Sequence, residues 1–210
     1  MQYDLGRVVI KKAHHLPHWY VEHGIYFVTW HLADALPAAA RERIRNECDA
    51  YLELLRSRGG GALAAELELV RRFRRKLVNR TLDQCLGSCV LRGEPAAIVA
   101  NAIRFFDANR YELFAWSVMP NHAHAVFSAN DGCSLDGIMH SWKSYTSNKV
   151  NELLGRAGIL WEREYLDSTM RNDRQLQRTI AYVVSNPVKA ELFDWPFVES
   201  YPERIARAIG

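Results

Sequence analysis

Two strand-like segments with only two residues between them place the strongest constraint on the fold of this chain. Residues 111–119 (YELFAWSVM) and 122–129 (HAHAVFSA) are rich in aromatic and β-branched residues, and Pro120-Asn121 lies between them. Two strands joined this tightly pair as antiparallel neighbours, because a parallel pair needs a crossover of a dozen or more residues. The sequence therefore predicts an antiparallel hairpin in its second half.

The segments around this hairpin indicate an α+β protein. A further strand is predicted at 25–32 (IYFVTWHL). Apolar residues at helical spacing predict helices over 38–58, 62–82, 95–107, 134–154 and 173–185. Gly59-Gly60-Gly61 ends the first helix, and Asn186-Pro187 ends the last, because proline disfavours the α conformation in the residue before it. This order of elements is typical of an α+β fold and differs from the strict alternation of a parallel-sheet protein.

Length and composition fit one globular domain. The 210 residues are 49% hydrophobic and 24% charged, which excludes a disordered chain and allows a core without disulfides. There is no internal repeat and no Gly/Ser linker, so we predict a single domain over residues 1–210. The net charge of +3 excludes no class of partner until the positions of the charges are known.

The N-terminus and the cysteines indicate a cytoplasmic protein. The segment MQYDLGRVVIKKAHH lacks the apolar stretch and the cleavage site of a secretory signal. No stretch approaches the ~18 uncharged apolar residues of a membrane span. The four cysteines are therefore expected as free thiols in a reducing compartment. The step from Cys85 to Cys89 suits one helix face and not a C-x-x-C zinc site, so we assign no chemistry to this pair.

His122 and His124 are the first candidates for a functional site. Side chains alternate between the two faces of a strand, so both imidazoles are expected on the same face. Two neutral imidazoles in this arrangement can bind one divalent cation if a third ligand comes from elsewhere in the chain. The alternative is a polar strand face that carries two solvated histidines.

Tyr182 and Asn186 form the second candidate pair. Their four-residue separation places both side chains on one face of a helix. Asn186 can offer a carbonyl oxygen to a hard cation, and Tyr182 can offer a phenol as a nucleophile. The alternative is a tyrosine of the core or its rim, followed by an asparagine that ends the helix before proline.

In combination these motifs resemble those of the HUH single-strand endonucleases. Met119-Pro120-Asn121-His122-Ala123-His124 is followed by Tyr182-x-x-x-Asn186-Pro187-Val188-Lys189-Ala190. Their order is similar to that in the IS200-like tyrosine transposases, and within them to the REP-associated (repetitive extragenic palindrome) branch. The resemblance runs from about residue 16 to residue 195, and it includes L-P-H-W at 16–19, W-E-R-E-Y-L-D at 161–167 and D-W-P at 194–196.

The resemblance implies both a fold and a site. The fold is a ferredoxin-like antiparallel sheet with helices, with the histidine pair on a middle strand and Tyr182 on a helix that faces it. His122 and His124 are implied as metal ligands, Asn186 as the third ligand and Tyr182 as the nucleophile. The implied cofactor is Mg²⁺ or Mn²⁺. Ala123 occupies the centre of the HUH motif, and Asn186 stands where many relatives have Gln.

The implied activity is metal-dependent nicking and joining of single-stranded DNA at hairpin-forming repeats, as in DNA transposition. The reaction passes through a 5′-phosphotyrosine link, and the protein acts as a monomer or a homodimer. The alternative is a cleavage-inactive hairpin-binding protein derived from a transposase, although the intact motifs favour the enzyme. A metallo-hydrolase is excluded, because Ala125-Val126 follows the histidine pair where metallo-β-lactamase-like enzymes have Asp-His.

A cluster of basic residues is the candidate for DNA binding. Residues 71–80 contain six basic residues and no acid, so they could contact phosphates, or they could form an ordinary solvated helix face. The candidates are Arg71, Arg72, Arg74 and Arg75, with Lys143 and Lys189 nearer in sequence to the motifs. Trp142 and Trp161 could stack unpaired bases or belong to the core.

Tyr145 and Tyr165 are rival nucleophiles. Lys149 stands four residues after Tyr145, where the motif of Tyr182 has asparagine, and Tyr165 lies in an extended segment. Tyr182 is therefore preferred.

Overall fold

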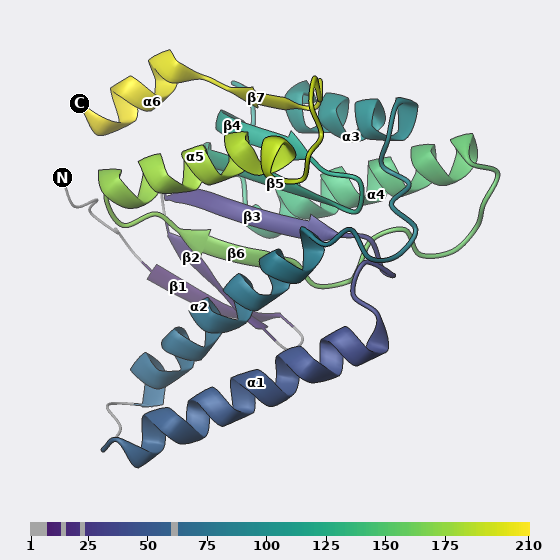
Figure 1. Cartoon of the computed structure of the whole chain (residues 1–210). Coiled ribbons are helices and arrows are strands. Elements are labelled where there is room, and N and C mark those ends of the chain that lie inside the picture. The colour runs from purple at the N-terminus through teal and green to yellow at the C-terminus, as the bar shows by residue number, and fades with distance from the viewer. Residues whose placement is uncertain (1–7, 14–15, 22–23, 60–62) are drawn as a thin grey trace.

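A five-stranded antiparallel sheet forms the centre of the protein (Figure 1). The computed structural model describes residues 8–13, 16–21, 24–59 and 63–210. The sheet has the strand order β6-β3-β5-β4-β7, and all neighbouring strands in it are antiparallel. Its strands are β3 (Ile25–His31), β4 (Tyr111–Val118), β5 (His122–Ala129), β6 (Leu166–Thr169) and β7 (Val198–Ser200). The predicted α+β fold is confirmed, and β5 is its middle strand.

The predicted hairpin is formed by β4 and β5. Val118 pairs with Ala123, and the backbone N–H of Met119 donates to the carbonyl oxygen of His122 at 2.7 Å, which closes the turn through Pro120 and Asn121. The pairing shifts once, between Leu113 and Ala115. A separate two-stranded sheet pairs β1 (Val8–Ala13) with β2 (Leu16–Val21).

Helices cover both faces of the large sheet. They are α1 (Ala38–Ser57), α2 (Leu63–Leu82), α3 (Glu94–Phe105), α4 (Leu135–Leu153), α5 (Asp173–Lys189) and α6 (Pro202–Ile209). Side chains of α3 and α4 join the larger apolar cluster on one face, whereas α5 and α6 join a smaller cluster on the other face. Helices α1 and α2 pack on each other and lie beside the β6 edge (Figure 1).

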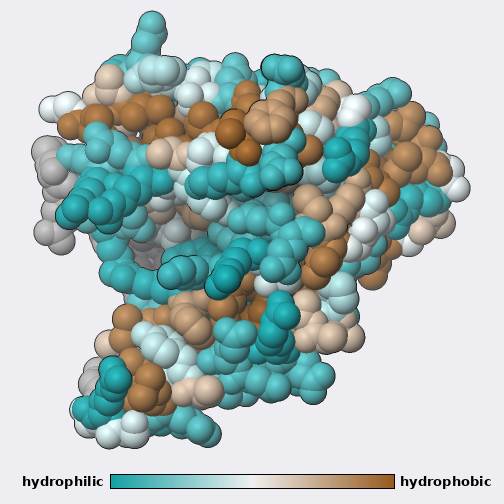
Figure 2. All heavy atoms as spheres, viewed as in Figure 1, coloured by the Kyte–Doolittle hydropathy of each residue, from teal (hydrophilic) through white to brown (hydrophobic). Residues whose placement is uncertain are grey.

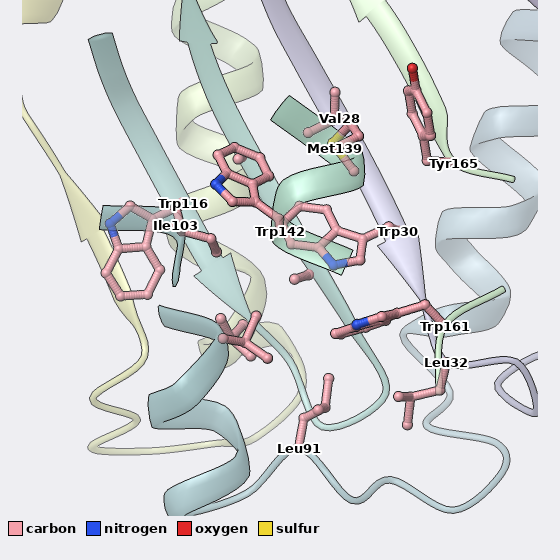
Figure 3. Close-up of a cluster of buried hydrophobic side chains, with 14 of the residues drawn as sticks. Val28, Trp30, Leu32, Leu91, Ile103, Trp116, Met139, Trp142, Trp161 and Tyr165 are labelled. Atoms are coloured by element: carbon pink, nitrogen blue, oxygen red, sulfur yellow. The ribbon is translucent and has the colours of Figure 1, made fainter. Parts of the chain in front are cut away.

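Tryptophans fill the larger cluster (Figure 3). The rings of Trp30 and Trp142 stack with centroids 5.5 Å apart, and the ring of Trp161 lies 6.1 Å from that of Trp30. Trp142 and Trp161 are only 2% and 3% exposed, so they belong to the core and are not available to stack unpaired bases.

Helix α5 continues through Pro187 to Lys189, so the prediction that it ends before this proline is wrong. Proline removes one N–H donor, which leaves the carbonyl oxygen one turn earlier without its helical partner. The last turn closes beyond the proline, since the N–H of Ala190 donates to the carbonyl oxygen of Asn186 at 3.1 Å. Asn186 therefore lies inside a regular helix, one turn from Tyr182.

Cys85 and Cys89 lie in the loop between α2 and α3, and not on a helix as their spacing suggests. Both have positive φ, 50° and 47°, and Gly87 between them has φ 85°. A Cβ on Gly87 would lie 2.5 Å from the carbonyl oxygen of Asp34, so this close approach requires glycine. All four cysteines are free thiols, and burial raises the pKa of Cys85 to about 11.

Parts of the predicted N-terminal organisation lie outside the described residues. Residues 1–7, for which the sequence predicts no secretory signal, are among them, as are Gly60 and Gly61 beyond the end of α1. In the part of the chain that the structure describes, no helix has the length and apolar composition needed to cross a membrane.

Candidate active site

His122 and His124 lie on one face of β5, the middle strand. Both side chains are fully buried, and their Nε2 atoms are 3.0 Å apart. His124 stacks on Phe27 with ring centroids 5.5 Å apart, and Phe27 belongs to the apolar cluster under α5. The predicted same-face geometry is confirmed, and the alternative of two solvated histidines is wrong.

Asn121 fixes the proton on the ring of His122. Its Nδ2 donates to the carbonyl oxygen of Leu82 at 3.1 Å, so its Oδ1 faces Nδ1 of His122 at 2.7 Å. An amide oxygen can only accept, so Nδ1 carries the proton and Nε2 keeps its lone pair. Nδ1 of His124 lies 2.8 Å from the hydroxyl of Thr29, which can donate or accept, so this contact orients the ring without fixing the position of its proton. Imidazoles that bind a metal are commonly oriented through their other nitrogen in this manner.

The surroundings keep both histidines neutral. Burial lowers the pKa of His124 to about 3. Burial, followed by the proximity of His124 and His31, lowers the pKa of His122 well below its ordinary range. Because a metal ligand must be deprotonated, it favours cation binding that neither ring carries the extra proton of an imidazolium at neutral pH.

Helix α5 brings Tyr182 and Asn186 to this pair. The helix begins where the side chain of Asn172 accepts from the N–H of Gln175 at 2.9 Å. Its buried apolar residues pack on the sheet, which turns the ring of Tyr182 toward His124, with centroids 5.3 Å apart. The two predicted pairs, 58 positions apart from His124 to Tyr182 in sequence, therefore meet at one place.

The polar atoms that α5 contributes have no protein partner. Within the described residues, the hydroxyl of Tyr182 and both polar side-chain atoms of Asn186 are buried without a hydrogen bond. A buried polar group without a partner costs about 1–3 kcal/mol, so native proteins usually satisfy or use such groups. Three of them beside two neutral imidazoles indicate a place for a polar ligand.

Asp83 and Lys189 set the charge around the phenol. Oδ1 of Asp83 lies 3.9 Å from Nε2 of His122, and burial raises the pKa of this carboxyl to about 6 against the opposing effect of Lys189. Nζ of Lys189 lies 5.3 Å from the centroid of the Tyr182 ring. Burial and the charge of Asp83 raise the pKa of Tyr182, and the nearby amide of Asn186 lowers it, although the two side chains do not have the geometry of a hydrogen bond. The phenol is therefore protonated at neutral pH.

The histidine pair, Tyr182 and Asn186 all fall in a segment with known relatives. Residues 90–186 match the family whose description is "Transposase IS200 like". The resemblance to IS200-like transposases is confirmed. A REP-associated tyrosine transposase of Escherichia coli (strain K12) is 25% identical over 103 residues, which are 47% of this chain and 59% of that protein. The match therefore spans less than two thirds of the length of this relative.

The similarity to solved structures extends beyond that segment. A solved structure of a REP-associated tyrosine transposase bound to a REP hairpin aligns with 94% of this chain and 88% of its own, with a TM-score of 0.54 and 17% identity. At this identity the match shows a shared fold. Helices α1 and α2 precede the segment that matches the IS200-like family.

The predicted DNA-binding arginines of α2 make different contacts. Arg71 and Arg72 form ion pairs with Glu68 at 3.9 and 3.0 Å. Arg74 lines a cavity beside α1, away from the histidine pair. Arg75 is half-buried, and its guanidinium donates to a backbone carbonyl oxygen of β6 at 2.8 Å. Arg71, Arg74 and Arg75 line one small pocket beside β6, and the predicted contacts of all four arginines with DNA remain predictions.

The two predicted lysines also lie in different surroundings. Nζ of Lys143 donates to the backbone carbonyl oxygens of Glu162 and Arg163 at 2.8 and 2.7 Å, which ties the segment after α4 to that helix. Lys189 lies against the ring of Tyr182. Lys189 is therefore the one of the two beside the residues that match the IS200-like motifs.

The rival tyrosines lie apart from the histidine pair. Tyr145 is 52% exposed on α4, which packs on the opposite face of the sheet. The hydroxyl of Tyr165 donates to Asp136 at 2.6 Å. Neither has the unpaired hydroxyl beside His124 that Tyr182 has.

Asp83 is the site residue that the sequence does not predict. It directly follows the last residue of α2, and no spacing links it to histidines 39 positions later. Only the packing of α2 beside the sheet brings it there. Its acidic type just after a basic helix is the one sequence signal that could have drawn attention to it.

The donor set suits a hard or intermediate divalent cation. No three His, Cys, Asp or Glu side chains among the described residues are grouped so that they could hold a metal ion. Two imidazole nitrogens and the unpaired amide of Asn186 are the available donors. An amide oxygen suits Mg²⁺ and Mn²⁺, and imidazole suits transition metals such as Mn²⁺ better than it suits Mg²⁺.

The two neutral histidines should make the stability of the protein depend on pH. Their pKa values in the folded state lie below the ordinary 6.5, so the unfolded chain binds more protons. The free energy of unfolding should therefore fall as the pH falls below about 6.5, by up to ~1.4 kcal/mol per pH unit for each histidine.

Urea unfolding at pH 7 and pH 5 in the presence of EDTA measures this dependence. The variant His124→Asn should lose part of the pH dependence, whereas His140→Asn, on the exposed surface of α4, should keep it. An equal pH dependence in all three proteins would contradict the assignment of buried, neutral imidazoles.

Proposed function

We propose that this protein nicks and joins single-stranded DNA at hairpin-forming repeats, in a metal-dependent reaction with a 5′-phosphotyrosine intermediate. The observation that carries the proposal is the meeting of a buried, unpaired phenol and an unpaired amide with two neutral imidazoles. The match to IS200-like transposases supports it. A relative with the same fold is described as bound to a REP hairpin, which supports hairpin DNA as the substrate.

His122, His124 and Asn186 are the residues that would hold the metal. Mg²⁺ or Mn²⁺ bound there would supply Lewis-acid stabilisation of the charge on a phosphodiester. Asn121 and Thr29 orient the imidazoles, and the low pKa values of the histidines keep both rings neutral at neutral pH.

Tyr182 would supply the nucleophile. Its oxygen attacks the phosphorus and loses its proton, the bond from phosphorus to the 3′-oxygen breaks, and the 3′-hydroxyl leaves. The reverse attack by a 3′-hydroxyl restores the phenol and rejoins a strand, so the bond energy is kept in the phosphotyrosine link. The protonated state of the phenol and its raised pKa explain why a cation is needed beside it.

The proposal is tested with a pool of 3′-labelled DNA hairpins that have randomised single-stranded flanks. After incubation with Mn²⁺ or Mg²⁺, a denaturing gel should show labelled DNA attached to the protein, and EDTA should prevent this. Mass mapping of the adduct identifies the modified residue. An adduct that forms equally in EDTA would contradict the role of the metal. Tight hairpin binding with no adduct under any condition would support the cleavage-inactive alternative.

A further inference from the structure

The two imidazoles of the candidate site are in contact with each other. Their Nε2 atoms lie 3.0 Å apart, which is the length of a hydrogen bond and too short for two lone pairs that face each other. Nε2 of His122 holds a lone pair, because the ring hydrogen lies on Nδ1 opposite the amide oxygen of Asn121. The hydrogen between the two rings therefore lies on Nε2 of His124.

This hydrogen determines what the hydroxyl of Thr29 does. With a hydrogen on Nε2, the neutral ring of His124 has a lone pair at Nδ1, which lies 2.8 Å from that hydroxyl. The hydroxyl therefore donates. Four donors in the structure then point the same way along one chain, which runs from Thr29 through His124, His122 and Asn121 to the carbonyl oxygen of Leu82. Hydrogen bonds in such a chain strengthen one another.

A divalent cation held by both rings needs a lone pair on each Nε2 atom. Resting on the metal-dependent function proposed above, we propose that Thr29 is a positioning residue that reverses its hydrogen bond to His124 when the cation binds. The ring hydrogen of His124 moves from Nε2 to Nδ1, and the hydroxyl of Thr29 changes from donor to acceptor. The ring keeps one hydrogen and stays neutral throughout, so no charge is created in the buried site.

The two histidines differ in the group that holds Nδ1. The amide of Asn121 is itself fixed, because its Nδ2 donates to the carbonyl oxygen of Leu82 at 3.1 Å. Its oxygen can only accept, so the hydrogen of His122 stays on Nδ1 in both states. A hydroxyl has one donor and two lone pairs, so Thr29 suits both forms of His124. His124 is therefore the ring that changes.

The sheet holds the Thr29 oxygen in place for both forms. Thr29 lies directly opposite His124 in the pairing of β3 with β5, and opposite Leu166 in the pairing of β3 with β6. Residues directly opposite each other leave the sheet on the same face. Thr29 is completely buried, and its β-branched side chain is stiff at χ1. The oxygen is therefore fixed, while the hydroxyl hydrogen can turn.

A groove between α2 and α5 gives a cation access to the rings. It has a volume of about 680 Å³ and is lined by Tyr182 and by Asp83, whose Oδ1 lies 3.9 Å from Nε2 of His122. Figure 2 shows the surface between these helices hollowed and mostly hydrophilic. An ion can therefore approach from water, and the hydrogen bond between the two rings is the contact that it has to replace.

NMR on protein with ¹⁵N-labelled histidine measures the positions of the ring hydrogens, and His124→Asn assigns the signals. In EDTA, His124 should carry its hydrogen on Nε2, and His122 should carry its hydrogen on Nδ1. Zn²⁺ serves as a diamagnetic probe that imidazole binds well. On addition of Zn²⁺ the hydrogen of His124 should appear on Nδ1, and that of His122 should not move.

The variant Thr29→Val removes the hydroxyl and keeps the branched shape. The bound form of His124 then has a buried Nδ1 hydrogen without an acceptor, so the affinity for Mn²⁺ should fall by roughly 10–100-fold, as is typical when a residue that orients a metal ligand is lost. Thr29→Ser keeps a hydroxyl and should restore most of the affinity. In EDTA the hydrogen of His124 should stay on Nε2 in both variants, because His122 is unchanged.

The matched control is Thr169→Val on β6. It removes a hydroxyl that has no hydrogen-bond partner within the described residues, so its affinity for Mn²⁺ should equal that of the parent protein. Calorimetry measures the affinities, and circular dichroism compares the folds.

A hydrogen of His124 on Nδ1 in EDTA would overturn the proposal, and so would equal affinity of Thr29→Val and the parent for Mn²⁺. Equal loss in Thr29→Ser and Thr29→Val would show that the hydroxyl is not the decisive group, which would also overturn it. The adduct assay with DNA is independent of these measurements. A parent protein that shows the move of the His124 hydrogen but forms no adduct would refute the cleavage reaction and leave the role of Thr29 standing.

Discussion

The variant Tyr182→Phe should form no covalent adduct with DNA while it folds as stably as the parent protein. No other group of the candidate site can accept the phosphate in the proposed reaction. The lost hydroxyl makes no hydrogen bond within the described residues, so its removal breaks none. Relief of an unpaired buried group is worth about 1–3 kcal/mol, so the free energy of unfolding should stay equal or rise by up to that amount.

A denaturing gel with 3′-labelled hairpins measures the adduct, and urea unfolding measures the stability. Tyr145→Phe is the matched control, because it removes a phenol from the exposed surface of α4 and should leave the adduct unchanged. An adduct that persists in Tyr182→Phe, or that maps to Tyr145 or Tyr165, would show that the nucleophile is another residue.

Replacement of His122 by alanine should abolish cleavage and weaken metal binding. Its Nε2 lies 3.0 Å from Nε2 of His124, so the variant leaves only His124 and Asn186 as proposed metal ligands. The affinity for Mn²⁺ should fall by more than the roughly 10–100-fold that is typical when a residue orienting a metal ligand is lost. Affinity for the hairpin should change only a few fold, because contacts with phosphates dominate DNA binding.

Titration of Mn²⁺ in a calorimeter and anisotropy with labelled hairpin separate the two effects. His140→Ala, on the exposed surface of α4, is the control and should retain both affinities and cleavage. Because His122 is buried, the circular dichroism of the variant is compared with that of the parent. Folded His122→Ala that still binds Mn²⁺ as tightly as the parent would refute this residue as a ligand.

Local patterns in the sequence were sufficient for the three central strands of the sheet and for the histidine pair, but they did not predict β6 and β7. The tight junction at Pro120-Asn121 defines the β4–β5 hairpin, and the period of two places both imidazoles on one face. The predicted end of α5 was wrong. The residue before proline has only a modest preference against the α conformation, and the packing of α5 on the sheet outweighs it. Tertiary packing decides where such a helix ends, and it cannot be read from the local sequence.

The long-range parts of the site could not be predicted. Asp83 reaches His122 only because α2 ends beside the start of β5. The basic residues of α2 lie in different surroundings. Arg71 and Arg72 form ion pairs with Glu68, while Lys76 and Arg80 line a groove between α2 and α5. Helical spacing predicts which of these side chains share a face of the helix, but not which face packs against the sheet.

The alignment of β5 against its neighbours has a consequence for how the site could be lost. Successive side chains of a strand point to opposite faces, so a slip by one residue against β3 and β4 would turn His122 and His124 toward α3 and α4. Ala123 and Ala125 would then face Tyr182. A chain with the same composition and nearly the same architecture would have no imidazole there. The two-residue turn before His122 thus sets the register of β5. A single deletion in this turn could abolish activity without altering any residue of the site.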